Sequence, residues 1–211
     1  MTALLDPRLP AIGLFGGTFD PVHLGHLIVA TELRHALGLD RLLFVPAGRP
    51  PHKSGQEVAD DEHRLTMLRL ALAGTPDLEV STADLDQGSP SYTADLLVRL
   101  GAELGPARLV FLIGNDSLRD LPNWREPRRI AALAELGVAA RLGAPVDLAA
   151  VLAAVPEARG RVHLVETPLI GISSREIRRR VAAGAPIRFQ VPAAVEGYIR
   201  EHGLYRAVGG R

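Results

Sequence analysis

Two histidines stand three residues apart in the segment Gly16-Gly17-Thr18-Phe19-Asp20-Pro21-Val22-His23-Leu24-Gly25-His26. A short apolar run precedes this segment and an amphipathic stretch follows it, which predicts a strand, a glycine loop and the start of a helix. Glycines let backbone N–H groups approach a ligand closely, and a helix N-terminus adds unpaired amides and a positive dipole end. The pattern therefore predicts a phosphate cradle.

Both imidazoles fall in the first turn of the predicted helix, so His23 and His26 lie on one face and can donate to phosphate oxygens. A metal-binding pair or an exposed surface pair is the alternative interpretation. Gly25, between them, leaves room for a base or ribose against the helix. We expect this loop to bind phosphate through Gly16, Gly17, Thr18, Phe19 and Gly25.

Short β-rich apolar runs alternate with stretches of helical period along the whole chain, which is typical of a parallel sheet with helices on its faces. Strands are predicted at residues 11–15, 41–46, 78–82, 108–113, 136–141 and 161–166. Helices are predicted at residues 24–37, 61–73, 92–104, 127–134, 148–153 and 174–183, and a last helix follows Pro192 and ends at Gly203. We expect one α/β domain with a doubly wound, Rossmann-like, mostly parallel sheet whose strand-end loops hold the ligands.

The composition narrows the classes of partner. The chain has 211 residues, 24 basic and 24 acidic side chains, and no cysteine. A net charge of zero gives no overall field for nucleic acid or anionic membrane, and the lack of cysteine excludes disulfides and thiolate chemistry. No apolar run approaches the roughly 20 residues that span a bilayer, and no signal-like segment is present, so we expect a cytoplasmic protein.

The expected domain covers residues 11–205, with residues 1–10 as an N-terminal extension and residues 206–211 as a C-terminal tail. No repeat or linker-like boundary divides it. The oligomeric state is left open.

The segment from Gly16 to His26 resembles the signature of the nucleotidyltransferase superfamily that carries an H-x-G-H motif and is related to the class I aminoacyl-tRNA synthetases. A second segment, Ile172-Ser173-Ser174-Arg175-Glu176-Ile177-Arg178, resembles the I-S-S-[ST]-x-[IL]-R box of that superfamily, with Arg175 in place of the usual Ser or Thr. The resemblance implies that Ile172, Ser173 and Ser174 bind phosphate. It also implies that His23, His26 and Arg178 are catalytic, with Arg178 on the β and γ phosphates.

Four segments between these motifs resemble those of the bacterial nicotinate-nucleotide adenylyltransferases, and the resemblance extends from the first strand to Tyr205. They are Pro50-Pro51-His52-Lys53, Ser91-Tyr92-Thr93-Ala94-Asp95, Ile113-Gly114-Asn115-Asp116-Ser117-Leu118 and Leu121-Pro122-Asn123-Trp124. The resemblance implies that nicotinate mononucleotide is bound by His52, Lys53, Tyr92, Thr93, Asp116 and Trp124. An aromatic plane in a polar loop can stack on a pyridine ring, whereas Asp116 could equally cap a helix.

The implied reaction is adenylyl transfer from ATP to nicotinate mononucleotide, which gives deamido-NAD and pyrophosphate by direct in-line attack. A phosphate nucleophile is already anionic near neutral pH, so no general base is required. Mg²⁺ is expected on the triphosphate, held mostly by phosphate and water oxygens rather than by a protein metal site. N–H groups at the start of the helix after Ser91 would favour the nicotinate carboxylate over an amide.

Two alternatives remain open from the sequence. One is an adenylyl- or cytidylyltransferase on the same scaffold that acts on nicotinamide mononucleotide or another phosphorylated small molecule. The other is a nucleotide-binding regulator that keeps the fold without turnover.

Overall fold

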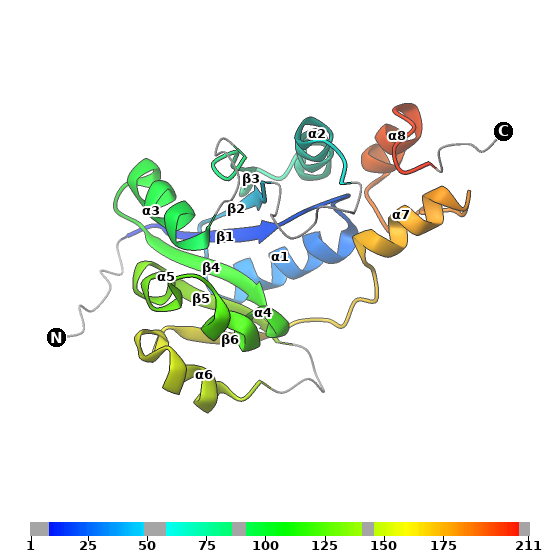
Figure 1. Cartoon of the computed structure of the whole chain (residues 1–211). Coiled ribbons are helices and arrows are strands. Elements are labelled where there is room, and N and C mark those ends of the chain that lie inside the picture. The colour runs from blue at the N-terminus through cyan, green and yellow to red at the C-terminus, as the bar shows by residue number, and fades with distance from the viewer. Residues whose placement is uncertain (1–8, 49–57, 86–91, 141–145, 207–211) are drawn as a thin grey trace.

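A computed structural model describes residues 9–48, 58–85, 92–140 and 146–206. Six strands form one sheet in the order β3-β2-β1-β4-β5-β6, and every neighbouring pair is parallel. The strands are β1 (Ala11–Gly17), β2 (Arg41–Pro46), β3 (Leu78–Val80), β4 (Arg108–Gly114), β5 (Glu135–Ala140) and β6 (Val162–Glu166). Figure 1 shows the sheet between two layers of helices.

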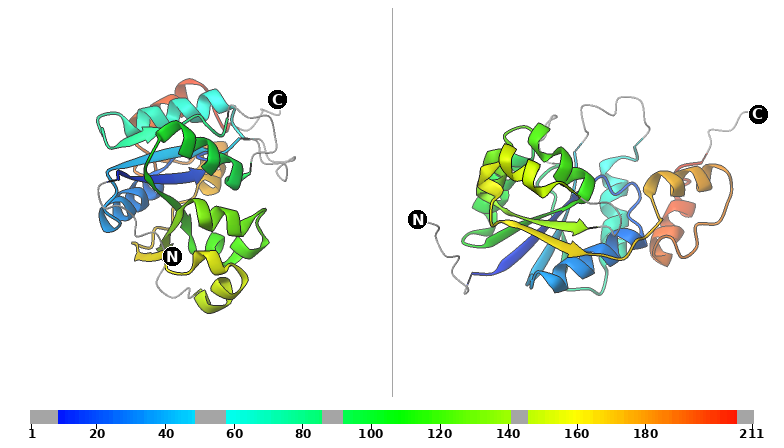
Figure 2. Two further views of the ribbon diagram at one scale, coloured as in Figure 1. Left: turned by 90° about the vertical axis from the view of Figure 1, so that its left-hand side faces the viewer. Right: turned by 90° about the horizontal axis from the view of Figure 1, so that it is seen from below.

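The helices divide between the faces and the end of the sheet. They are α1 (Leu24–Ala36), α2 (Asp61–Leu72), α3 (Thr93–Leu104), α4 (Asn115–Asp120), α5 (Pro127–Leu133), α6 (Leu148–Ala154), α7 (Ser174–Ala182) and α8 (Ala193–Glu201). Short 3-10 turns cover Leu121–Asn123 and Pro156–Ala158. Helices α7 and α8 lie beyond the carboxyl ends of the strands, as the views in Figures 1 and 2 agree.

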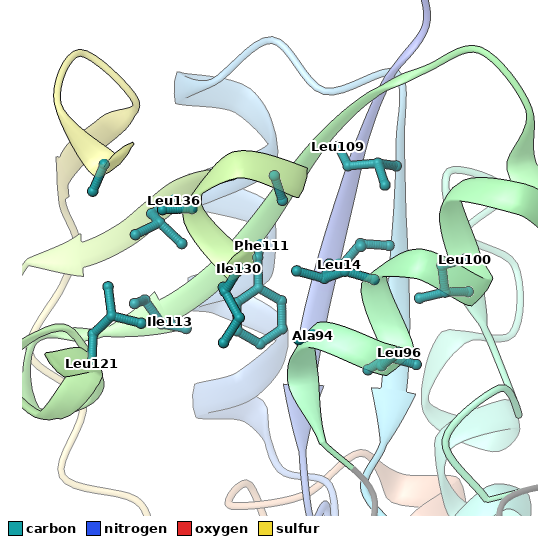
Figure 3. Close-up of a cluster of buried hydrophobic side chains, with 14 of the residues drawn as sticks. Leu14, Ala94, Leu96, Leu100, Leu109, Phe111, Ile113, Leu121, Ile130 and Leu136 are labelled. Atoms are coloured by element: carbon teal, nitrogen blue, oxygen red, sulfur yellow. The ribbon is translucent and has the colours of Figure 1, made fainter. Parts of the chain in front are cut away.

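Side-chain alternation along the central strands builds a separate core on each face of the sheet. In β4, Phe111 and its alternate neighbours Leu109 and Ile113 pack with α3, α5 and α6. Figure 3 shows this cluster around Leu14, Phe111 and Ile130. Val110 and Leu112 point the other way, into a core shared with α1, α2 and α8. Strands buried on both faces read as continuous apolar runs, which is why β4 is so clear in the sequence.

The strand order reverses between β1 and β4, because the chain leaves β1 toward β2 and β3 and returns to continue on the other side with β4, β5 and β6. Ligands of open α/β sheets bind in the crevice at the carboxyl ends of the strands at such a reversal. The predicted fold class is confirmed. Gly16 and Gly17 are the last two residues of β1 rather than part of a loop, and the segment 18–23 that follows them lies at this crevice together with the polar segment after β4.

One element was not predicted. Helix α4 follows β4 directly at Asn115 and is six residues long, which is too short to show a helical period in the sequence. Among the described residues, no helix is long and apolar enough to cross a membrane.

Candidate active site at the reversal point of the sheet

Two cavities flank the carboxyl ends of β1 and β4. The larger has a volume of about 360 Å³ and the smaller about 260 Å³. Phe15, Ile113 and Gly114 line both cavities, so the two share a wall at the strand reversal. Two ligands that occupied them would therefore lie next to each other.

The larger cavity contains the two histidines together with the second motif. His23, His26 and Gly25 of the α1 entry line it, and so do Ile172, Ser173 and Ser174 at the start of α7. Thr167, Pro168 and Ile170, in the segment after β6, complete the wall and were not predicted from the sequence. The structure therefore brings the two phosphate motifs, which lie about 150 residues apart, into one cavity.

The two histidines cap the helix that carries them. His23 is the N-cap of α1, and its Nδ1 accepts from the backbone N–H of His26 at 3.3 Å. Reciprocally, the Nδ1 of His26 accepts from the backbone N–H of His23 at 3.2 Å. The rings stack with centroids 3.6 Å apart and an interplanar angle of 19°. Because each Nδ1 acts as an acceptor, the proton of each neutral ring lies on Nε2, which becomes the donor.

Burial keeps both rings neutral at physiological pH. Desolvation lowers the pKa of His23 from 6.5 to about 4, against a backbone hydrogen bond that raises it. Desolvation, and then the charge of His23, lower the pKa of His26 from 6.5 to about 3. The site therefore presents two neutral N–H donors, and neither imidazole is a cation at pH 7.

Two neighbours hold the imidazoles in place. A Cβ atom on Gly25 would lie 3.0 Å from the Nδ1 of His23, so the glycine allows this ring to fold back against the helix. Phe19 is 1% exposed, and its ring meets that of His26 edge-on at 5.0 Å. Phe19 was predicted to bind phosphate. Its side chain is not among the residues lining either cavity, and it supports His26 from the core.

The second motif is fastened to the glycine loop by side-chain hydrogen bonds. The hydroxyl of Ser174 donates to the carbonyl of Pro21 at 2.9 Å, and Nη1 of Arg178 donates to the carbonyl of Asp20 at 2.6 Å. Ser173 is the N-cap of α7, and its Oγ accepts from the backbone N–H of Glu176 at 3.2 Å. Arg178 is not among the residues lining the larger cavity, and its guanidinium holds the loop that carries the histidines.

A buried polar network lies under this loop. The carboxylate of Asp20, 1% exposed, accepts from the hydroxyl of Tyr205 at 2.6 Å and lies 3.5 Å from Arg178. Burial raises the pKa of Tyr205, and the charge of Asp20 raises it further, so this hydroxyl remains a donor. Arg64 of α2, also 1% exposed, donates to the carbonyl of Thr18 at 2.8 Å. Tyr205, Arg178 and Arg64 thus hold the loop through the side chain of Asp20 and the backbone carbonyls of Thr18 and Asp20.

Sequence reasoning missed these network residues, although each carries a signal. Arg64 lies on the same helical face as the buried Met67 and Leu68, and an arginine on an apolar stripe is expected to have a buried partner. Asp20 lies within the first motif. Tyr205 marks the end of the resemblance with no role assigned to it.

The smaller cavity is lined by the glycine pair and by two of the residues predicted to bind nicotinate mononucleotide. Gly16 and Gly17 form one wall, and Thr93, the first residue of α3, and Trp124 form another. The indole of Trp124 meets the ring of Phe111 edge-on at 6.2 Å. This contact leaves the indole half-buried at the cavity. Gly16 and Gly17 thus lie at the smaller cavity rather than beside the histidines.

Asp116, which was also predicted to bind nicotinate mononucleotide, lies away from both cavities. Asp116 is in the first turn of α4 with a side chain 78% exposed, pairs with Arg119 at 3.3 Å, and lines neither cavity. Its neighbour Ser117, one position further along the helix, lines the smaller cavity instead. His52 and Lys53 lie outside the described residues.

Within the described ranges, no group of three or more His, Asp or Glu side chains could hold a metal ion. Oδ1 of the buried Asp20 carboxylate accepts from Tyr205 and from the backbone N–H of Ala59, and Oδ2 lies 3.5 Å from Nη1 of Arg178 with no hydrogen-bond donor among the described residues. The protein donors at this site therefore suit anions, and they do not form a carboxylate cage for magnesium.

Comparison with known proteins identifies the family of the chain. The family model for cytidylyltransferase-like proteins matches residues 14–180, so the chain belongs to that family of nucleotidyltransferases. The chain is 57% identical over 197 residues to the "Probable nicotinate-nucleotide adenylyltransferase" of Thermomicrobium roseum. This alignment covers 93% of this chain and 92% of the relative. A protein of the same name from Thermus thermophilus is 46% identical over 195 residues, and this alignment covers 92% of this chain and 99% of the relative. Within the family, the chain belongs with the nicotinate-nucleotide adenylyltransferases.

Solved structures support the fold. The chain superposes on Plasmodium falciparum nicotinic acid mononucleotide adenylyltransferase complexed with NaAD, with a TM-score of 0.75 and 20% identity, over 93% of this chain and 97% of that one. The same enzyme complexed with APC gives a TM-score of 0.73 at 19% identity, over 93% of this chain and 97% of that one. At this identity the likeness defines the shared architecture.

Proposed function

We propose that this protein transfers the adenylyl group of ATP to nicotinate mononucleotide, forming deamido-NAD and releasing pyrophosphate. The observation that carries the proposal is the pair of cavities that share a wall at the strand reversal, with two neutral histidine donors lining the larger one. The family membership supplies the substrate class. In this assignment ATP occupies the larger cavity and the pyridine nucleotide occupies the smaller one.

His23 and His26 act as hydrogen-bond donors rather than as bases. Each Nδ1 is already an acceptor for a backbone N–H, and each Nε2 carries the proton. A donor fixed beforehand by capping and stacking costs no reorganisation when negative charge grows on the oxygens of the α-phosphate. The attacking phosphate of nicotinate mononucleotide is anionic near neutral pH, so proton removal is not required.

The start of α7 would hold the departing pyrophosphate. Helix α7 has nine residues, and the backbone N–H groups of Ser174 and Arg175 at its start lack intrahelical acceptors and are donors for an anion, whereas that of Glu176 donates to Ser173 Oγ. Ser173 and Ser174 line the cavity at this point. Arg178 lies one turn further in, where it fixes the Asp20 carbonyl and adds positive charge behind the phosphates.

The acceptor nucleotide would be held in the smaller cavity. Trp124 offers an aromatic face for the pyridine ring, and the first-turn amides of α3 at Thr93 offer donors for the ring carboxylate. His52 and Lys53 remain candidates for its phosphate. Asp116 remains a prediction from the resemblance, although its exposed carboxylate lies away from both cavities.

A divalent cation, which we propose to be Mg²⁺, would arrive on the triphosphate with its coordination completed mainly by phosphate and water oxygens. When bound, it supplies charge neutralisation to the leaving group. The described residues add backbone and side-chain donors around the same phosphates.

Replacement of either histidine tests the assignment. His26→Ala is expected to lower kcat by roughly two to four orders of magnitude, because loss of one preorganised donor costs on the order of 3 kcal/mol or more. His23→Ala should behave alike. His35→Ala, at an exposed position of the same helix, is the matched control. The assay follows deamido-NAD by chromatography and pyrophosphate by a coupled enzyme, after circular dichroism shows a native spectrum.

An activity of His26→Ala within about threefold of wild type would remove the histidine from the mechanism. A failure of the wild-type protein to form any dinucleotide from ATP and nicotinate mononucleotide would remove the proposed function itself.

A further inference from the structure

An arginine stacks on the residue that opens helix α3. The guanidinium carbon of Arg125 lies 4.0 Å from the centroid of the Tyr92 ring, which is a cation–π distance. Tyr92 is the N-cap of α3, and the next residue, Thr93, lines the smaller cavity. Arg125 itself follows Trp124, which lines the same cavity. Tyr92 and Arg125 are not themselves among the residues that line the smaller cavity, so the guanidinium lies next to the wall formed by Thr93 and Trp124, at the rim of the cavity.

Among the described residues, Arg125 differs from the neighbouring arginines in its ion pairing. Neighbouring arginines have carboxylate partners: Arg119 pairs with Asp116 at 3.3 Å, Arg128 with Glu157 at 3.9 Å, and Arg129 with Glu126 at 3.2 Å. In the part of the chain that the structure describes, Arg125 has no carboxylate within 4 Å.

Two acidic residues of the described part of the chain near this rim, Asp95 and Asp84, have partners of their own. Asp95, in the first turn of α3, lies 3.7 Å from Arg129. Asp84 lines the cavity on the β2 side, where its carboxylate accepts from the backbone N–H of Gly48 at 3.1 Å. Trp124, by contrast, rests on Phe111 of β4.

We propose that Arg125 is a specificity-determining residue that makes this site prefer a pyridine nucleotide with an anionic ring substituent over one with a neutral substituent. A pyridine nucleotide in the smaller cavity would lie beside the α3 N-terminus, where the Arg125 guanidinium stacks on Tyr92. The charge attracts a carboxylate and gives nothing to a carboxamide of the same size. This inference rests on the proposed function and adds to it the residue that selects the substrate.

The expected effect is moderate because the guanidinium is exposed. At a separation of several ångströms and an effective dielectric between those of protein and water, one charge changes the preference by about fivefold to tenfold. Salt screens such an interaction, so the preference should fall as ionic strength rises. The backbone donors of α3 provide the remainder of the discrimination.

The experiment compares kcat/KM for nicotinate and nicotinamide mononucleotides with saturating ATP and Mg²⁺, in wild type, Arg125→Gln and Arg125→Lys. Arg125→Gln keeps a planar group over Tyr92 and removes the charge, whereas Arg125→Lys keeps the charge and removes the planar stack. Arg128→Gln is the matched control, because it removes one positive charge three residues away, where Glu157 already pairs with it.

The proposal predicts that Arg125→Gln lowers kcat/KM for nicotinate mononucleotide about fivefold to tenfold and leaves the nicotinamide value within twofold. It also predicts that Arg125→Lys and Arg128→Gln keep the wild-type ratio, and that raising salt lowers the ratio in wild type but not in Arg125→Gln. An equal loss on both substrates would make Arg125 only a support for Tyr92 and would overturn the proposal. An unchanged ratio in Arg125→Gln would overturn it too. Absence of turnover with either nucleotide in wild type would instead defeat the proposed function.

Discussion

Replacing His26 by glutamine should make the fold less sensitive to acid. Glutamine at the third position of a helix is the usual partner in a capping box, so His26→Gln keeps a side chain that can reach back to the backbone N–H of residue 23. What it removes is the group that titrates. Activity will be lost, and the measurement is therefore one of stability.

The sign follows from the lowered pKa values. Folding lowers the pKa of His26 from 6.5 to about 3 and that of His23 to about 4. Between these values and 6.5 the unfolded chain binds protons that the folded chain does not, so acid favours unfolding. The stability that the neutral rings contribute is complete above about pH 6.5 and is lost as pH falls toward the folded pKa values.

The magnitude can be worked out for the interval from pH 7 to pH 5. Over this interval the unfolded state protonates a histidine of pKa 6.5 almost fully, while the folded state remains nearly unprotonated, which costs about 2 kcal/mol per histidine. The two rings together therefore account for a loss of about 4 kcal/mol. In His26→Gln the loss between pH 7 and pH 5 should be smaller than in wild type by about 2 kcal/mol.

The assay is urea unfolding followed by far-ultraviolet circular dichroism at pH 7, 6 and 5. Contributions from carboxylates are common to both proteins and cancel in the difference. His35→Gln, which removes an exposed imidazole from the same helix, controls for the substitution itself. A pH-dependent loss in His26→Gln equal to that of wild type within about 0.5 kcal/mol would refute the claim that this ring is held neutral by burial.

Three further substitutions test the site. Arg178→Ala should raise the KM for ATP about tenfold or more and slow pyrophosphate release in single-turnover kinetics. The control variant Arg179→Ala, at an exposed position, should have nearly wild-type kinetics. Equal effects of the two substitutions would show that this motif acts only as a general basic surface. Tyr205→Phe leaves the buried carboxylate of Asp20 short of one donor, so urea unfolding should show about 1 to 3 kcal/mol lower stability, and an unchanged value would make the hydrogen bond unimportant. Trp124→Ala should weaken nicotinate and nicotinamide mononucleotides alike, by about twofold to tenfold in kcat/KM, and a change in their ratio would contradict simple stacking.

The fold could be predicted from the sequence because its strands are buried on both faces and its helices are long enough to show a period. β4 appears as a continuous apolar run, and α3 places Ala94, Leu97 and Leu100 on one face. Helix α4 could not be found this way, since six residues give no period. The turn conformations could not be predicted either, because the left-handed φ of 49° at Phe19 is set by packing and not by its residue type.

The candidate site was predictable where chemistry is local in sequence and not where it depends on tertiary contacts. The histidine pair needed only helical spacing, and the structure places it in a cavity with the serines of α7. The tie of Arg178 to the Asp20 carbonyl joins residues 158 positions apart, which no spacing rule anticipates. Asp116 shows the limit of motif transfer, because one helical position decides whether a side chain faces the cavity, as Ser117 does, or faces solvent.

The central claim is direct transfer from a nucleotide in one cavity to a phosphate in the other. The most direct test uses ATP with a chiral sulfur-substituted α-phosphate, together with nicotinate mononucleotide and Mg²⁺, and determines the configuration at phosphorus in the dinucleotide formed. A single in-line displacement inverts the configuration, so the account predicts a thio-substituted deamido-NAD with inversion. Retention would indicate an adenylylated protein intermediate formed by a side chain, which contradicts the role of His23 and His26 as donors only.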